Sequence, residues 1–249
     1  MKYSTEQMDN YYINLSKGIV KTSGIMNYIQ HLLIAQSCLN SENVLEVCCG
    51  RSLIFPLLQR YSKINSYLGV DISKANLEEA KTLITSYDII DYSFKYQFLQ
   101  GDITQLSTFI HEEFDIIIYT SSLEHMSKTD GITSIIEINK ILKKGGILYL
   151  STPCSENNII QYKYHIYEWS YNDIKKLLNQ NNFILIDEIG LLPSDNFNFP
   201  EIYNKKFGVG CELWLSDLKN KMPQEFITPI LSASVPEFSK EVLFICKRL

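Results

Sequence analysis

Three acidic residues lie at or near the ends of apolar runs in the first half of this 249-residue chain. Glu46 stands just before a turn that contains Gly50, and Asp71 ends the next apolar run, about 20 residues further on. An acid at that distance can accept hydrogen bonds from both hydroxyls of a ribose. Asp102, after the third run, suits the exocyclic amine of an adenine. Because three acids on one rim would repel a pyrophosphate, the pattern predicts a site for a nucleoside that carries positive charge.

Two of the four histidines follow apolar runs whose ends should lie on that same rim. His125 follows the fourth run, and His165 follows the fifth. A histidine can accept the proton that an alcohol must lose when it acts as a nucleophile. We therefore predict that His125 and His165 act as the base or orient the acceptor. His31 and His111 have no evident reason to face the same cleft.

Strands and helices that alternate along the chain must position these side chains. The apolar runs are rich in Ile, Val and Leu without strict alternation, which is typical of strands covered on both faces of a mostly parallel sheet. The runs are 43–47, 66–70, 94–99, 114–119, 146–151, 183–190 and 241–247. Most neighbouring runs leave room for one helix between them. The sequence therefore predicts a doubly wound α/β fold.

Two of the intervening helices carry their own signals. Apolar residues recur at helical spacing between 128 and 142, and Gly145 follows a group of lysines, which predicts a helix with a glycine stop. Ser170, with Asp173 three residues later, is typical of an N-cap. We therefore expect a second amphipathic helix to begin after Ser170.

Two segments lie outside this alternation. Residues 1–40 carry aromatic and apolar residues at roughly helical spacing, so we expect a helical cap of one or two helices over the edge of the sheet. Residues 191–238 separate the last two runs, and compact domains rarely keep so long a connection without a use for it. We interpret this segment as a lid over the acceptor, inserted into a domain of residues 41–249. Packing of a small satellite core is the alternative.

The composition narrows the choice of partners. The formal net charge is −5 and the lysines are scattered, so the chain lacks the basic stripe that a phosphate backbone needs. We therefore expect a small-molecule or peptide-like acceptor rather than a nucleic acid or a membrane. No apolar run reaches the roughly 18 residues of a membrane helix, and the start lacks the apolar core of a signal peptide, which predicts a cytoplasmic protein. The six cysteines are expected to be free thiols, and the oligomeric state is not indicated.

Five short motifs resemble those of a known family. In order, VLEVCCGRS, GVDIS, GDI, FDIIIYTSSLEHM and GGILYLSTP resemble the motifs of class I S-adenosylmethionine-dependent methyltransferases. The resemblance spans residues 40–190 and implies a seven-stranded sheet whose last strand inserts antiparallel between the fifth and sixth. It also implies S-adenosylmethionine as the cofactor. The chain departs from the first motif, because Cys48 and Ser52 replace its first and last glycines.

The same resemblance assigns contacts to individual residues. The implied cofactor-binding residues are Glu46, Cys48, Gly50, Asp71, Ile72, Asp102, Ile103 and Ser121. Glu46 and the turn at 48–50 would hold the methionine moiety, and Asp71 would take the ribose hydroxyls. Ile72 would stack on the adenine. Asp102 would hold the N6 amine, and Ile103 would donate its backbone N–H to the ring.

A closer resemblance concerns the acceptor end of the site. Leu-Glu-His, Ser-Thr-Pro-Cys and His-x-x-Glu-Trp-Ser are similar to segments of small-RNA 2′-O-methyltransferases and ubiquinone-pathway O-methyltransferases, in which E-x-x-E-H and a later His bind a divalent metal. Glu124, His125 and His165 match those ligands. Ser121 stands at the position of the first Glu, so we predict transfer without a metal.

Together these features predict an S-adenosylmethionine-dependent methyltransferase that acts on oxygen in a small or medium-sized, natural-product-like acceptor. N-methylation is the alternative within the same fold, because an amine need only be bound unprotonated and the chain shows no other obvious base. A non-catalytic nucleoside-binding scaffold of the same fold is a further hypothesis, supported by the altered first motif.

Overall fold

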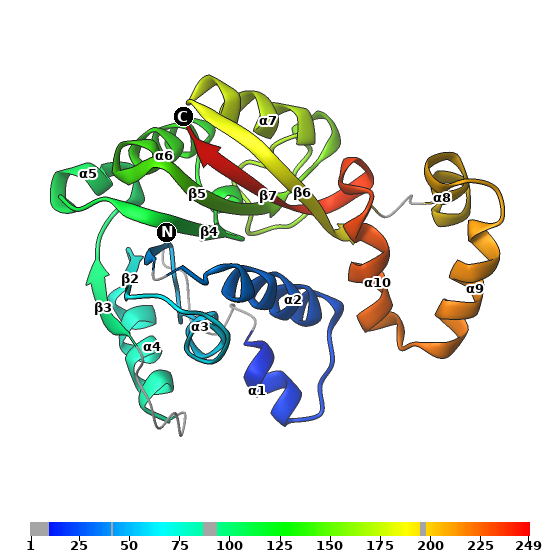
Figure 1. The fold of residues 1–249 in the computed structure, drawn as a ribbon, viewed down its shortest axis with the longest axis horizontal. Helices are drawn as coiled ribbons and strands as arrows, with labels where there is room; N and C mark the ends of the chain where they lie inside the picture. Colours follow the sequence, from blue (N-terminus) through cyan, green and yellow to red (C-terminus); the bar gives the residue numbers. More distant parts are fainter. Residues whose placement is uncertain (1–9, 41, 87–93, 195–197) are drawn as a thin grey trace.

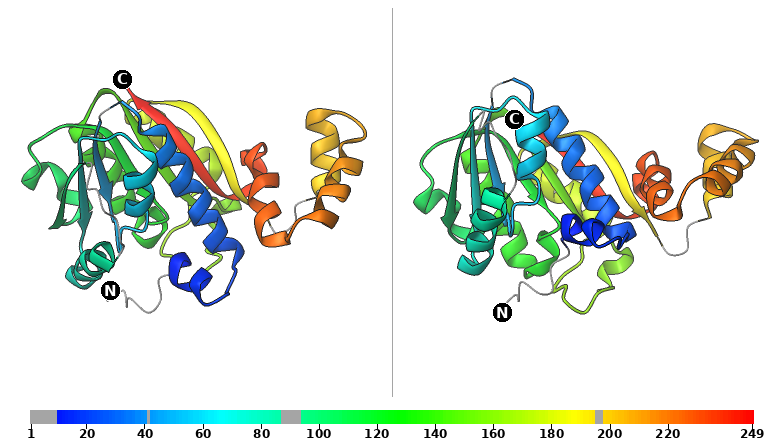
Figure 2. Two further views of the ribbon diagram at one scale, coloured as in Figure 1. Left: turned by 60° about the horizontal axis from the view of Figure 1, so that its bottom comes forward. Right: turned by 90° about the horizontal axis from the view of Figure 1, so that it is seen from below.

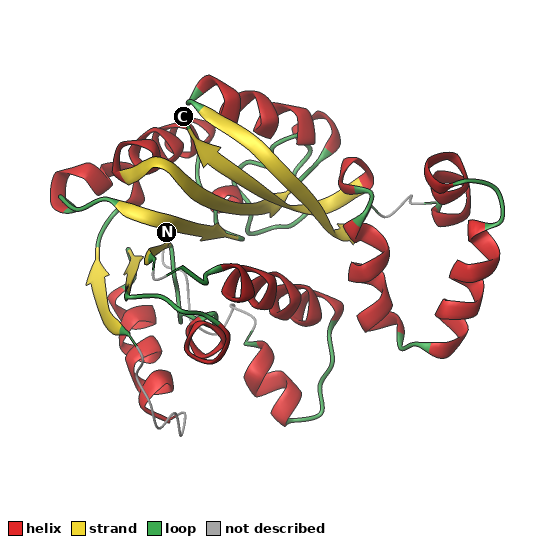
Figure 3. Ribbon diagram, viewed as in Figure 1, coloured by secondary structure: helices red, strands yellow, loops and turns green. Residues whose placement is uncertain are grey.

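A seven-stranded sheet forms the centre of the protein (Figure 1). The computed structural model describes residues 10–40, 42–86, 94–194 and 198–249. The strands are β1 Asn43–Val47, β2 Ser66–Asp71, β3 Lys95–Gln100, β4 Phe114–Thr120, β5 Leu142–Pro153, β6 Phe183–Pro193 and β7 Ser239–Arg248. Their order is β3-β2-β1-β4-β5-β7-β6, and β7 runs antiparallel to both of its neighbours (Figure 3). The seven predicted strands and the α/β fold are confirmed.

The central strands bury side chains on both faces of the sheet. Successive residues of a strand point to opposite faces. Accordingly, Leu45 of β1 and Ile117 of β4 belong to one apolar cluster, whereas Val44 and Ile116 belong to another. All four are almost completely buried. This double burial explains why the strands appear in the sequence as continuous apolar runs.

Helices cover both faces of the sheet. The helices are α1 Tyr11–Ser16, α2 Thr22–Ser37, α3 Phe55–Tyr61, α4 Lys74–Ser86, α5 Leu106–Phe109, α6 Lys128–Ile141, α7 Tyr171–Gln180, α8 Phe199–Phe207, α9 Cys211–Lys221 and α10 Gln224–Ala233. The two helices predicted from capping signals are α6 and α7, and the Ser170 hydroxyl accepts a hydrogen bond from the Asp173 N–H at 3.2 Å. Gly145 has a left-handed φ of +78° but lies four residues beyond α6, within β5. No helix among the described residues is long and apolar enough to cross a membrane.

Helix α2 packs over the middle of one sheet face, not over its edge. Ile34 and Ala35 of α2 share an apolar cluster with Ile116 of β4, Tyr149 of β5 and Leu243 of β7. Residues 11–16 and 22–37 of the N-terminal segment are helical, but α2 lies over central strands and not over the predicted sheet edge. The buried side of α2 is apolar enough to cover central strands, which the spacing of its residues alone did not indicate.

The segment between β6 and β7 folds into three helices. Helix α10 packs against β6 and α2, whereas α8 and α9 project from the body of the protein (Figure 2). Tyr203, Leu215 and Ile227, one from each helix, form the centre of a separate small core. The Tyr203 hydroxyl donates to the backbone carbonyl of Leu231 in α10. A satellite core is therefore present, and Phe197, one of the aromatics of the predicted lid, lies outside the described residues.

Candidate active site

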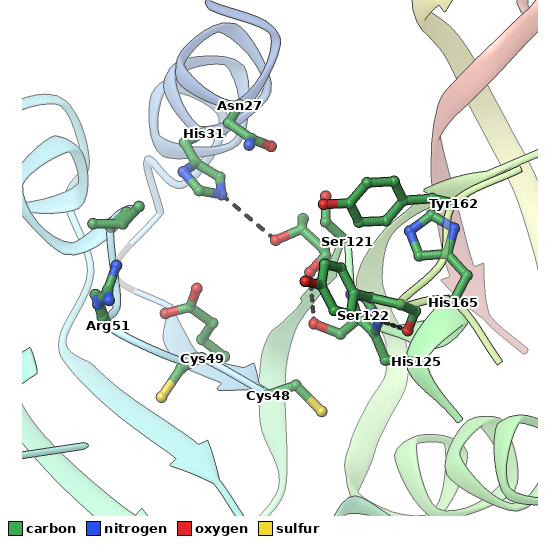
Figure 4. Close-up of a pocket in the computed structure, with 14 residues that line it drawn as sticks. Asn27, His31, Cys48, Cys49, Arg51, Ser121, Ser122, His125, Tyr162 and His165 are labelled. Atoms are coloured by element: carbon green, nitrogen blue, oxygen red, sulfur yellow. Dashed lines mark hydrogen bonds between the residues drawn. The ribbon is translucent and has the colours of Figure 1, made fainter. Parts of the chain in front are cut away.

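A cavity of about 230 Å³ opens at the carboxyl ends of β1 and β4 (Figure 4). Four parts of the chain line it: α2, the end of β1 with the turn after it, the end of β4, and the segment 162–165. Parallel strands end at one rim of a sheet, so residues distant in sequence meet there. The structure thereby brings five of the predicted site residues to one cavity, namely Glu46, Cys48, Ser121, His125 and His165.

The turn after β1 has an unusual backbone. Cys48, Gly50 and Ser52 all have left-handed φ angles, of 52°, 52° and 53°. Ser121, on the opposite wall, has a φ of 47°. A non-glycine residue in this region costs roughly 1–2 kcal/mol, and such strain concentrates at functional sites. Cys48 and Ser52, which stand where the first motif of the resembling family has glycines, therefore hold a conformation that glycine adopts easily.

Glu46 is anchored beneath this turn. Its side chain is 4% exposed and accepts hydrogen bonds from the Ser52 hydroxyl, at 3.2 Å, and from the Tyr67 hydroxyl. Burial raises the pKa of Glu46 to about 8, against the opposing effect of these two hydrogen bonds. A cation bound beside Glu46 would favour its ionised form.

Asp71 fixes the position of the same turn from β2. Its carboxylate accepts hydrogen bonds from the Gly50 N–H at 2.8 Å and from the Ser73 N–H at 2.7 Å. Burial raises the pKa of Asp71, although these backbone donors oppose the shift. Asp71 is thus already a structural part of the turn, and its remaining lone pairs are those that a ribose would use.

The predicted adenine contacts lie further along the rim, outside the cavity. Ile72 is 66% exposed. Asp102 accepts hydrogen bonds from the Thr104 N–H and hydroxyl, both at 2.8 Å, and so caps the short helix that begins at the buried Ile103. Since Asp71 pairs with Gln100 in the β2–β3 register, Asp71 and Asp102 follow one another along the rim. Their roles toward a ligand stay predictions.

His125 and His165 form a pair at one end of the cavity. Their ring centroids are 5.2 Å apart. Nδ1 of His165 lies 2.6 Å from Glu168 Oε1, and Nδ1 of His125 lies 3.1 Å from the Tyr164 carbonyl oxygen. A carbonyl oxygen can only accept, so Nδ1 of His125 carries the proton and Nε2 carries the lone pair. Burial lowers the pKa of His125, and the neighbouring His165 adds to this effect.

The same end of the cavity holds a group of potential metal ligands. One ligand atom each from Glu124, His125 and His165 lies within 4.8 Å of the others. His125 Nε2 is 3.7 Å from Glu124 Oε1. Each histidine is also held through Nδ1 by a protein acceptor, an arrangement common around metal-binding imidazoles. These residues could hold a divalent cation, and the predicted metal independence stays a prediction.

The cavity also contains residues that the sequence analysis did not select. Asn27 and His31 of α2, Arg51 of the turn, and Tyr162 and Tyr164 line it. The prediction that His31 has no reason to face the cleft is wrong. Its position follows from the packing of α2 over the central strands, for which no local sequence motif exists. Arg51, Tyr162 and Tyr164 are neighbours of recognised motifs, so proximity to those motifs was the only available signal.

Sequence comparisons identify proteins that this chain resembles. Residues 45–150 match the family described as a methyltransferase domain. The chain is 25% identical to the mRNA cap guanine-N(7) methyltransferase of Saccharomyces cerevisiae over 251 residues, which cover 92% of this chain and 52% of that protein. It is 27% identical to the ubiquinone biosynthesis O-methyltransferase of Bartonella quintana over 166 residues, or 59% and 62% of the two chains. The chain thus spans about half of the length of the cap methyltransferase.

Solved structures share the fold at low sequence identity. A S-adenosylmethionine-dependent methyltransferase from Clostridium acetobutylicum superposes with a TM-score of 0.57 at 13% identity, covering 95% of this chain and 96% of that one. The cyclase SpnF superposes with a TM-score of 0.60 at 13% identity, covering 90% and 80%. A cyclase among these structures shows that the fold alone does not determine the reaction.

The sheet order is that of the class I methyltransferase fold. Together with the family match of residues 45–150, this shows that the chain carries a class I S-adenosylmethionine-dependent methyltransferase domain, and S-adenosylmethionine is the cofactor of that family.

The side chains on the rim fit this cofactor chemically. The sulfonium carries positive charge, and the acids Glu46, Asp71 and Asp102 are distributed along the rim. The exposed apolar surface of Ile72 is available to an aromatic base. The left-handed turn at Cys48–Gly50 opens directly onto the cavity, where a methionine chain would pass close to the backbone.

Proposed function

We propose that this methyltransferase transfers its methyl group to an oxygen of a small or medium-sized acceptor bound beside His125 and His165. The observation that carries the proposal is the imidazole pair, which lies in the same cavity as Cys48 of the cofactor turn. The similarity to ubiquinone biosynthesis O-methyltransferases supports transfer to oxygen. The acceptor itself is unassigned.

The chemistry requires little more than positioning and one base. When bound, the cofactor would supply a methyl group on a positively charged sulfur, and the electron pair of the carbon–sulfur bond would stay on sulfur as the methyl group transfers to the acceptor oxygen. The acceptor proton passes to Nε2 of His125 or His165. The lowered pKa keeps His125 neutral at physiological pH and therefore able to accept that proton. Tyr162 and Tyr164 line the same end and are placed to exclude water.

The test uses cell extract and S-adenosylmethionine with an isotopically labelled methyl group. We expect a small molecule to gain one labelled methyl group that resists acid hydrolysis as an aryl or alkyl ether does. A labelled amine as the main product would replace O-methylation with N-methylation. A protein that binds neither S-adenosylmethionine nor its demethylated product would favour the scaffold hypothesis.

Guanine N7 is a second candidate acceptor, because three cap guanine-N(7) methyltransferases of yeasts match 85–92% of this chain. Guanine N7 already carries a free lone pair and no proton, so methylation of this atom needs no base. The net charge of −5 argues against a long RNA contact. Labelling of a guanosine-capped RNA oligonucleotide, with an uncapped oligonucleotide as the control, separates this candidate from small-molecule transfer.

Metal assistance is an alternative for the acceptor end, supported by the cluster of Glu124, His125 and His165. We expect turnover to survive dialysis against a strong chelator, since Ser121 stands where the metal-binding relatives have Glu. Loss of turnover that magnesium or manganese restores would show that these three residues suffice as ligands.

A further inference from the structure

The cavity has two chemically different ends (Figure 4). His125, His165 and Tyr162 gather at one end, which we assign to the acceptor. At the other end, His31 of α2 faces the turn after β1. This second end lies beside the cofactor turn and the end of β4, so a group bound there belongs to the cofactor rather than to the acceptor.

The hydrogen bonds of His31 fix its tautomer. The Tyr11 hydroxyl lies 3.0 Å from the carbonyl oxygen of Leu53 and 2.9 Å from Nδ1 of His31. A carbonyl oxygen can only accept, so the single hydroxyl proton of Tyr11 points to Leu53. The Tyr11 oxygen must therefore accept a hydrogen bond from Nδ1–H of His31. In the neutral ring, Nε2 then carries a lone pair.

The surroundings keep His31 neutral and leave Nε2 weakly engaged. His31 is 7% exposed, and burial lowers its pKa to about 3. Nε2 lies 3.5 Å from the Thr120 hydroxyl, at the outer limit of a hydrogen bond. A better donor in the cavity would displace this contact at little cost.

The other groups at this end complete a site for an α-amino acid. His31 Nε2 and the Glu46 carboxyl, which both line the cavity, are hydrogen-bond acceptors. An ammonium group offers three N–H donors and positive charge, so it suits both acceptors. Arg51 brings a guanidinium to the same end, with its Nε held 2.5 Å from Glu79, and a guanidinium suits a carboxylate.

We propose that His31 binds the α-ammonium group of S-adenosylmethionine through Nε2. Tyr11 acts indirectly, because its hydroxyl group holds the imidazole ring of His31 in the required tautomer. The N-terminal helices thereby supply a cofactor contact that lies outside the motifs at the strand ends. This inference rests on the cofactor and holds for either an oxygen or a nitrogen acceptor.

The experiment measures binding of S-adenosylhomocysteine, the demethylated product, which carries the same ammonium group. Calorimetry compares the wild type with His31→Leu, and the exposed His111→Leu serves as the control variant. We expect His31→Leu to weaken binding about ten- to hundredfold, the range for a hydrogen bond to a charged group, and His111→Leu to leave it unchanged.

A ligand variant shows whether the ammonium group is the one recognised. In the deamino analogue of S-adenosylhomocysteine, hydrogen replaces the α-amino group. Wild type and His31→Leu should bind this analogue with the same affinity within about twofold, because the contact has been removed from both complexes. Equal losses for both ligands would overturn the proposal and make His31 a packing residue. Unchanged affinity for S-adenosylhomocysteine in His31→Leu would overturn it as well.

Nitrogen NMR of the wild type gives a readout that needs no variant at His31. The imidazole of His31 should be the Nδ1–H tautomer, and its Nε2 resonance should move when S-adenosylhomocysteine is added but not when the deamino analogue is added. Tyr11→Phe keeps the aromatic ring but removes the acceptor of Nδ1–H, so the Nε2–H tautomer should appear. A proton on Nε2 in the wild-type complex would overturn the proposal. None of these results depends on finding the methyl acceptor.

Discussion

The rim cavity and the projecting pair of helices α8 and α9 are built in opposite ways. The cavity combines four distant parts of the chain and contains left-handed non-glycine residues and a buried Glu46. The pair α8–α9 shares a small apolar core with α10 and exposes Val209, Leu213 and Trp214. Among the described residues that line the cavity, none belongs to α8, α9 or α10. Strain and a buried carboxyl group thus accompany the chemistry, whereas the projecting helices have a small apolar core and several exposed apolar side chains.

The largest effect should come from the imidazole pair. We expect His125→Ala or His165→Ala to lower turnover about 10²- to 10⁴-fold, because the base or the orientation of the acceptor is lost. Cofactor affinity should change little, which calorimetry with S-adenosylhomocysteine would check. His111→Ala is the control. Near-wild-type turnover in both variants would indicate a nitrogen acceptor that needs no base, and would remove the catalytic contrast between the two regions.

A smaller effect is expected at Asp71. Asp71→Asn should weaken binding of S-adenosylhomocysteine by roughly 1.5–3 kcal/mol if the carboxylate accepts hydrogen bonds from the ribose. Because Asp71 also holds the Gly50 and Ser73 N–H groups, the variant alone does not separate the two roles. An analogue without the ribose 2′-hydroxyl separates them, since its affinity should differ less between wild type and variant. Equal affinity of both proteins for the intact ligand would rule out the ribose contact.

The difference between the two regions also explains what the sequence could predict. The strands carry a strong signal because each is a short apolar run with a polar residue at its carboxyl end, so Asp71 and His125 could be placed on one rim in advance. His31 could not, because its role depends on the packing of α2 and on Tyr11, 20 residues earlier. The same holds for the projecting helices. Their aromatic residues are visible in the sequence, but tertiary packing decides whether these residues face the cavity or a separate core.

The buried carboxyl group of Glu46 at the rim should make the stability of the protein depend on pH. Burial raises the pKa of Glu46 to about 8, whereas an unfolded Glu titrates near 4.3. A raised carboxyl pKa favours the folded state fully below the unfolded pKa, and this contribution is lost as pH rises through the folded pKa. Between about pH 4.5 and 8, Glu46 therefore becomes progressively unfavourable to folding.

Replacing Glu46 with Gln removes this titration but keeps a side chain that can hydrogen-bond Tyr67 and Ser52. In urea unfolding without cofactor, we expect the stability of Glu46→Gln relative to wild type to increase from pH 5 to pH 8 by on the order of 1–3 kcal/mol. Burial also raises the pKa of Glu124 and Glu241, but these groups remain in both proteins and cancel in the difference. A difference that does not vary with pH would show that the folded-state pKa of Glu46 is not raised and that Glu46 is ionised in the folded protein throughout this range.

The smallest effect is expected at Trp214, where it tests the proposal that residues 191–238 act as a lid over the acceptor. Trp214 is 57% exposed on α9, so Trp214→Ala should change the free energy of unfolding by less than about 0.5 kcal/mol. If α8 and α9 close over a bound acceptor, the same variant should raise the KM for the acceptor about threefold to tenfold, the equivalent of roughly 1 kcal/mol of lost contact, without changing cofactor affinity. The only other tryptophan, Trp169, is buried beside Tyr167, so Trp214 should dominate any fluorescence change when acceptor is added. Hydrogen exchange on α8 and α9 that is as slow as in the sheet and indifferent to both ligands would make the segment a packing unit, and the two regions would then be independent of one another.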